Sequence, residues 1–144
     1  MSFSEQIPKI VIVGLLIGGV GVVVNNMMSG SSDAAVVDVE MPGKLSAKAV
    51  KGKRTFSENC EACHGENGAG SEQGPPLIHN IYNPGHHGDE SFYRAAVSGV
   101  TSHHWKFGNM PAQPQVSRYD MENVINFIRE IQVENGIRYQ AHKM

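Results

Sequence analysis

The sequence predicts an all-α domain of three to four helices joined by long loops, preceded by an apolar N-terminal segment. Apolar residues recur at helical spacing in three stretches after residue 45, and each stretch has a capping residue. The sequence contains neither a convincing pair of alternating strands nor an internal repeat. The length of 144 residues fits one domain with an appendage, and the formal net charge of −2 argues against a nucleic-acid-binding protein.

The N-terminal segment contains an uncharged apolar run from residue 10 to residue 24. A helix over this run would be about 22 Å long, which is short of a hydrocarbon core of about 30 Å. Extension to Met28 makes a span possible, so residues 1–28 are predicted to be a signal anchor that forms a transmembrane helix. Lys9 precedes the run and acidic residues follow it, which favours a cytoplasmic N-terminus. The alternative is a signal peptide cleaved among the small residues 29–35.

Residues 29–44 are predicted to be a flexible tether. The segment begins with serine and glycine, which are typical of flexible linkers, and a proline–glycine pair at 42–43 marks a break. In the alternative, residues 34–39 pack against the domain. The domain itself is expected to comprise residues 45–144.

The first helix of the domain is predicted to begin after Ser46, which is a good N-cap residue. This helix carries Val50, Gly52 and Phe56 and ends at the pair of cysteines that follows. A glycine-rich stretch over 65–76 ends in two prolines, and it is expected to form a loop.

Two further helices are predicted in the second half of the chain. The first has Asp89 and Glu90 in its opening turn, where acidic side chains favour the helix N-terminus. Residues at helical spacing follow these two: Phe92, Ala95, Ala96 and Gly99. The last helix begins at Ser117 and ends near Gly136. Its apolar stripe comprises Met121, Val124, Ile125, Ile128 and Ile131.

The chemistry of the sequence is concentrated in Cys60, Cys63 and His64, which stand in a C-x-x-C-H pattern. This pattern is the attachment signature of a c-type haem. Each thiol adds to one vinyl group of the porphyrin, and the histidine lies under the iron as a proximal ligand. A thioredoxin-like redox pair, half of a zinc site and a small disulfide are the alternatives. The redox pair would follow a strand in a βαβ pattern, and the zinc site would recruit more ligands at short spacing.

Met110 is the best candidate for a second iron ligand. It stands in a loop before Pro111, where the backbone can aim the thioether. Histidine and methionine together raise the haem potential into a range useful for electron transfer. The structural alternative is a methionine that fills a gap in the core.

Four further motifs accompany the haem motif along the chain: Gly52 with Phe56, Gly74-Pro75-Pro76-Leu77, Met110-Pro111 and Phe127. With them, residues 46–134 resemble a class I monohaem cytochrome c. The most similar group is a membrane-anchored bacterial one, which resembles the subunit III cytochrome of haem–copper oxidases. The resemblance implies the cytochrome c fold around one haem c, attached through Cys60 and Cys63. It also implies that Gly52 lets the last helix cross closely, and that the Pro75 carbonyl accepts a hydrogen bond from His64.

The histidine content departs from this family pattern. Trp105 and Phe107 are expected to form haem-pocket walls, and the Trp105 indole is an alternative hydrogen-bond donor to a haem propionate. Imidazole suits copper, nickel or zinc, so a second metal site is one alternative role for the histidine pairs. Another is that one histidine displaces Met110 from the iron, and a third is a capping role in loops. The histidines outside the haem motif are His79, His86, His87, His103, His104 and His142.

The resemblance implies an electron carrier rather than an enzyme, with His64 and Met110 as the iron ligands. The expected partners are redox proteins: a quinol-oxidising complex as the donor, and a terminal oxidase or periplasmic reductase as the acceptor. The expected location is the bacterial inner membrane, single-pass, with the haem domain on the periplasmic side, or the periplasm itself after signal cleavage. A haem-based gas sensor and a structural subunit of a respiratory complex are the alternative functions.

Overall fold

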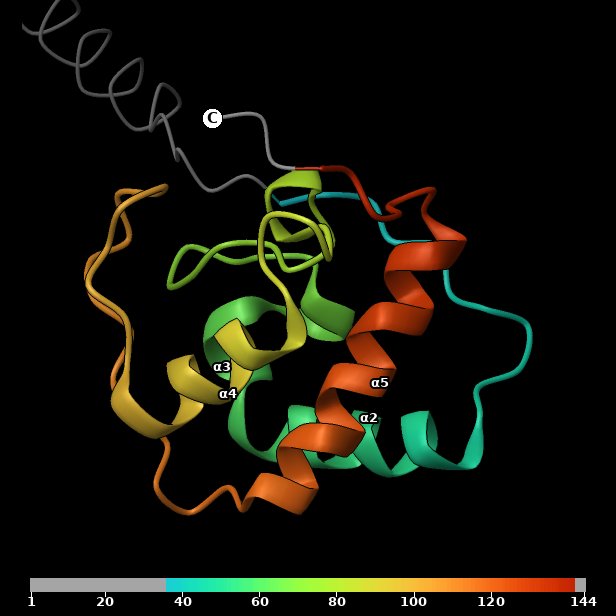
Figure 1. Cartoon of the computed structure of the whole chain (residues 1–144), viewed down its shortest axis with the longest axis horizontal. Helices are drawn as coiled ribbons and strands as arrows, with labels where there is room; N and C mark the ends of the chain where they lie inside the picture. The colour runs from blue at the N-terminus through green and yellow to red at the C-terminus, as the bar shows by residue number, and fades with distance from the viewer. Residues whose placement is uncertain (1–35, 142–144) are drawn as a thin grey trace, which may run out of the picture. The chain divides into compact units, whose positions relative to one another are not determined.

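The computed structural model describes residues 36–141, and within them it is all-α, as predicted. The helices are α2 (Ala47–Asn59), α3 (Glu61–His64), α4 (Asp89–Ser98) and α5 (Arg118–Glu134), with 3₁₀ turns η1 (Glu66–Gly68) and η2 (Asn80–Tyr82) (Figure 1). No helix in this part of the chain has the length and apolar character needed to cross a membrane. The predicted anchor at residues 1–28 lies outside the described residues.

Helices α2 and α5 cross in direct backbone contact. A Cβ atom built on Gly52 of α2 would lie 1.9 Å from the carbonyl oxygen of Asn123 in α5, so only glycine fits there. Close by, the rings of Phe56 and Phe127 pack at a centroid distance of 5.6 Å, and neither side chain is more than 1% exposed. The Gly52 crossing and the pairing of these two aromatic residues agree with the family resemblance.

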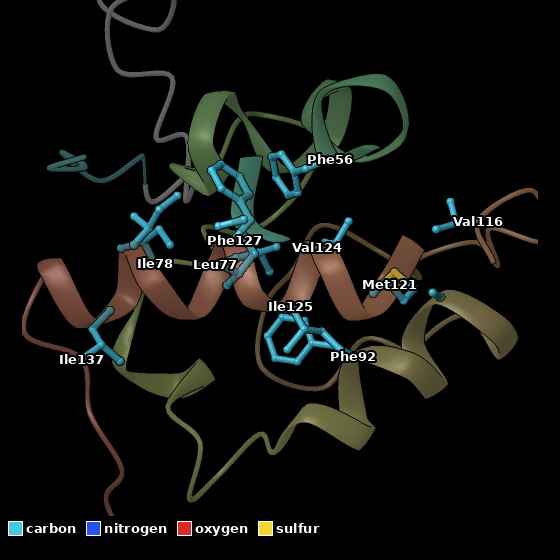
Figure 2. Packing of buried hydrophobic residues seen from close by; sticks show 14 residues of the cluster. Phe56, Leu77, Ile78, Phe92, Val116, Met121, Val124, Ile125, Phe127 and Ile137 are labelled. Atoms are coloured by element: carbon cyan, nitrogen blue, oxygen red, sulfur yellow. The ribbon is translucent and has the colours of Figure 1, made fainter. Parts of the chain in front are cut away.

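Helix α5 contributes more buried side chains to the core than any other helix. Its start is a capping box, in which the Ser117 hydroxyl accepts from Asp120 N and the Asp120 carboxylate accepts from Ser117 N. All five residues of the predicted stripe are buried: Met121, Val124, Ile125, Ile128 and Ile131. Figure 2 shows Phe56 and Phe127 on one side of α5 and Ile125 with Phe92 of α4 on the other. The helix is therefore the shared wall between α2 and α4.

The described part of the predicted tether is packed against the domain. Partly buried Val37, Val39 and Met41 contact the hydrophobic core. Asn135 donates to the carbonyl oxygen of Glu40 and accepts from its N–H, at 2.8 and 2.9 Å. Residues 37–41 are thus held by apolar contacts and hydrogen bonds instead of forming a flexible linker, because every second side chain from Val37 to Met41 finds apolar surface. Residues 29–35 of the predicted tether lie outside the described part.

Candidate haem site

The two cysteines stand at a short break between α2 and α3. Helix α2 ends at Asn59, and Cys60 then caps α2 while its carbonyl oxygen accepts from the N–H groups of Cys63 and His64 at 3.1 and 2.9 Å. Cys60, Cys63 and His64 therefore all lie within one helical turn. No separate helix was expected for the motif, because one turn is too short to show a hydrophobic period.

The electrostatics of the cysteine pair argue against a thiol redox site. Burial, with a smaller contribution from Cys63, raises the pKa of the Cys60 thiol to about 11. A catalytic redox pair needs the opposite shift, since it works as a thiolate at neutral pH. Both cysteines are also free rather than bridged. The raised pKa of the Cys60 thiol therefore speaks against the redox alternative.

His64 is oriented by a backbone carbonyl. Its Nδ1 lies 2.9 Å from the carbonyl oxygen of Pro75, which can only accept, so Nδ1 carries the proton and Nε2 keeps a lone pair. This is the hydrogen bond that the resemblance implies. Burial lowers the pKa of His64, and the bond to Pro75 partly offsets that shift. The imidazole is therefore neutral near pH 7 and ready to bind a metal through Nε2.

The Pro75 carbonyl reaches His64 because the chain passes very close to the haem motif. A Cβ atom on Gly74 would lie 2.9 Å from the carbonyl oxygen of Cys63, so a larger residue would push this segment away. Ser71 fixes the same carbonyl from the other side with a hydrogen bond of 2.6 Å.

Met110 is placed by a loop that is closed at its base. Met110 and Val100 exchange two backbone hydrogen bonds of 3.0 Å each, which form an isolated antiparallel bridge. Gly99 turns the chain out of α4 at a φ of 73°, and a Cβ atom there would lie 2.5 Å from the Met110 carbonyl oxygen. The bridge thus fixes the backbone that carries the thioether. In Figure 1 this loop is the orange segment between α4 and α5.

These residues surround a cavity of about 430 Å³. Cys60, His64, Pro75 and Met110 all line it, and Cys63 lines a smaller adjoining hollow that also borders Met110. The rest of the wall is largely apolar and comes from α2, α4, α5 and the loops. Apolar wall residues include Phe56, Leu77, Phe92, Val116 and Val124. The structure therefore brings four of the five predicted cofactor-binding residues to one apolar cavity and places the fifth, Cys63, at the hollow beside it.

One buried polar atom in this cavity fits the edge of a haem. Trp105 lines the cavity, and its Nε1 is buried without a hydrogen bond of good geometry. The Tyr82 hydroxyl is its neighbour: burial raises the pKa of Tyr82, and the Trp105 indole offsets part of that rise. A buried donor without a partner costs about 1–3 kcal/mol, so a ligand acceptor is expected there. A propionate carboxylate is such an acceptor.

The comparison with known families decides the assignment. The family model described as cytochrome c matches residues 49–132, which span the haem motif, the Met110 loop and most of α5. The chain belongs to the cytochrome c family. No curated protein and no solved structure matches it in the corresponding searches. As a cytochrome c, the protein is implied to carry covalent haem c and to act in haem-based electron transfer, and its Cys60, Cys63 and His64 have the spacing of the attachment motif.

The structure also brings together histidines that are far apart in the sequence. The pairs His86–His87 and His103–His104 meet at the cavity wall, where His86 and His104 lie 3.2 Å apart between their Nε2 atoms. Burial and the neighbouring histidines lower the pKa of His87 and of His104. His79 instead caps η2 and contacts Trp105 edge-on, and His142 lies outside the described residues.

Sequence reasoning did not find the polar residues that hold this wall. Arg129 of α5 donates to the carbonyl oxygens of Tyr82 and His87, at 2.7 and 2.6 Å. Gln132, which is 1% exposed, donates to the carbonyl oxygen of Leu77 at 2.9 Å. The sequence feature that could have revealed them is Gln132, which directly follows Ile131 of the apolar stripe. A polar side chain buried at that position needs a hydrogen-bond partner.

Proposed function

We propose that this cytochrome c shuttles single electrons between a membrane-bound donor and a terminal oxidase or periplasmic enzyme. The observation that supports this most strongly is the convergence of His64 and Met110 on one apolar cavity, each positioned by its backbone. His64 and Met110 would both bind the haem iron, and an iron held by both would have no position open for a substrate. We therefore also propose that the protein is a carrier and not an enzyme.

The chain contributes attachment, orientation and exclusion of water. When bound, haem c supplies an iron centre that gains and loses one electron. Cys60 and Cys63 would hold the porphyrin through thioether bonds, while Pro75 orients the His64 imidazole and keeps its proton on Nδ1. The apolar wall contributed by α2, α4 and α5 lowers the local dielectric and excludes water, which tunes the potential of a haem site.

The location and the partners belong to the same proposal. An N-terminal anchor at residues 1–28 would hold the haem domain on the periplasmic side of the bacterial inner membrane; cleavage would leave it free in the periplasm. A quinol-oxidising complex is the proposed donor, and an oxidase or reductase is the acceptor. The proposal is supported by the apolar run at 10–24 and by the resemblance to the membrane-anchored group. Electron-transfer complexes in general have small and transient interfaces.

The test is the absorption spectrum of the oxidised protein and of its Met110→Ala variant. The parent protein is expected to show the weak far-red band of ferric haem with histidine and methionine ligands, and the variant is expected to lose it. Met41→Leu is the matched control, because Met41 packs on the core and does not line the cavity. A parent protein without the band, or one that binds carbon monoxide rapidly when reduced, would favour a gas sensor over a carrier.

A further inference from the structure

Three histidines outside the haem motif present their ring nitrogens to one another. In His86, His87 and His104, one ligand atom from each residue lies within 4.8 Å of the other two. The closest pair is His86 Nε2 and His104 Nε2, at 3.2 Å. These atoms come from two segments, the turn after η2 and the loop after α4, so only the fold brings them together.

The hydrogen bonds of the cluster leave a ring nitrogen of His87 available. His87 Nδ1 lies 2.7 Å from the carbonyl oxygen of Ile81. A carbonyl only accepts, so the proton is on Nδ1 and Nε2 keeps its lone pair. Histidine ligands of metal ions commonly donate their second ring nitrogen to a carbonyl in this way, which fixes the tautomer and the ring orientation.

The segment that carries His86 and His87 is held firmly in place. Asn83, which is 6% exposed, accepts from the N–H groups of Gly85 and His86 through its side-chain oxygen at 2.9 and 3.2 Å. On the other side, the Arg129 guanidinium donates to the His87 carbonyl oxygen at 2.6 Å. The ligand positions are therefore built into the turn before any ion binds, while the exposed side chain of His104 can adjust.

We propose that His86, His87 and His104 form a site for a divalent transition-metal ion, with Zn²⁺ as the probe. In a tetrahedral zinc site, Zn–N bonds of about 2.0–2.1 Å place neighbouring nitrogen atoms about 3.3 Å apart. The His86–His104 separation of 3.2 Å already matches this edge. A small rotation of the exposed His104 and of His86 brings the third nitrogen into range, and the fourth position is left for water.

The site is distinct from the haem-iron ligands although it lies on the wall of the same cavity. None of its three histidines belongs to the attachment motif, and the iron ligands His64 and Met110 are fixed by other hydrogen bonds. An ordinary imidazole–imidazole hydrogen bond between His86 and His104 would also give a short distance. Only a metal titration separates these two arrangements.

The experiment is a calorimetric titration of the metal-free, haem-loaded full chain with Zn²⁺. We expect one equivalent to bind, with no change in the haem absorption spectrum. His86→Gln and His104→Gln should each weaken binding at least about tenfold, since even residues that only support a metal ligand are worth 10- to 100-fold. Their haem spectra and unfolding midpoints establish that they are folded.

Two control variants keep the ligand set intact. In His79→Asn the new side-chain oxygen can still accept from Ile81 N, so η2 keeps its cap. In His103→Asn the exposed neighbour of His104 is lost. Both controls should bind Zn²⁺ as the parent does. The proposal is overturned if the parent binds no Zn²⁺, if the two ligand variants bind it normally, or if either control is weakened as much as they are.

Discussion

At the scale of single residues, Trp105 is the best test of how the cavity holds its cofactor. Trp105→Phe keeps an aromatic wall but removes the buried Nε1 donor that lacks a partner. If this donor meets a propionate, its loss leaves more negative charge near the iron, so the reduction potential of the haem should fall by tens of millivolts. About 59 mV corresponds to a tenfold change in a one-electron equilibrium. Spectroelectrochemical titration measures this.

The folded state of that variant is checked by its unchanged Soret band and unfolding midpoint. An unaltered or higher potential would mean that the indole faces no carboxylate. Phe107→Leu, on the same wall, removes no hydrogen-bond donor and should leave the potential nearly unchanged.

Residues that carry chemistry were predictable from the sequence to different degrees. Cys60, Cys63 and His64 are adjacent in the chain, so their shared role is visible without a fold. Met110 required the further argument that a loop can orient a thioether. In the structure, the backbone bridge between Val100 and Met110 fixes that loop. The histidine pairs were weighed as a second metal site, but that the two pairs meet, and that Arg129 holds one of them, could not be foreseen, because these contacts join segments that only tertiary packing brings together.

At the scale of secondary structure elements, the crossing of α2 and α5 makes the sharpest prediction. Alanine is a better helix former than glycine by about 1 kcal/mol, so Gly52→Ala would stabilise an isolated helix. In the folded protein the new Cβ would lie 1.9 Å from backbone of α5, which cannot move away as a flexible side chain would. We expect a net loss of at least about 2 kcal/mol in the free energy of unfolding.

Guanidinium unfolding of the haem-loaded protein measures this loss. Gly43→Ala is the matched control, since nothing lies within 4 Å of the new Cβ atom, and it should be neutral or slightly stabilising. Equal stability of the two variants would contradict the close crossing.

The main helices were predictable because their signals are local. Ser46 and Ser117 cap α2 and α5 as their positions in the sequence suggested, and the α5 stripe follows the helical period. Helix α3 and the two 3₁₀ turns were not predicted, since a single turn has too few residues to show a period. Packing of the stretch 36–44 was expected only as the alternative, for residues 34–39, because its glycine, proline and polar residues resemble a linker and its partners, such as Asn135, are distant in sequence.

At the scale of the whole domain, Arg129 connects three elements. Its guanidinium pairs with Asp89 of α4 at 2.9 Å and donates to the carbonyl oxygens of Tyr82 in η2 and of His87. The side chain is only 16% exposed, and its loss removes the donor to the His87 carbonyl, whereas the Tyr82 carbonyl still accepts from Gln132. Arg129→Gln should lower the free energy of unfolding by about 2–4 kcal/mol and weaken Zn²⁺ binding by loosening the histidine turn.

Arg118→Gln serves as the matched control for this variant. Arg118 also lies in α5 and pairs with an acidic residue of α4, Glu90, but at 3.6 Å and with a side chain that is 74% exposed. Its replacement should cost less than about 1 kcal/mol, as for most exposed ion pairs. Thermal unfolding measures the stability of both variants. If Arg118→Gln lowers the free energy of unfolding as much as Arg129→Gln does, the contacts of Arg129 with α4 and η2 are not important for stability.

The crossing of α2 and α5 has a consequence for the order of events in biosynthesis. Synthesis from the N-terminus presents α2 and the attachment motif first, and α5 emerges only after the Met110 loop. The core remains open until α5 arrives, because α5 supplies more of its buried side chains than any other helix. Covalent capture of the porphyrin is therefore separable from folding: a chain cut before α5 retains every attachment residue and still lacks the helix that closes the domain.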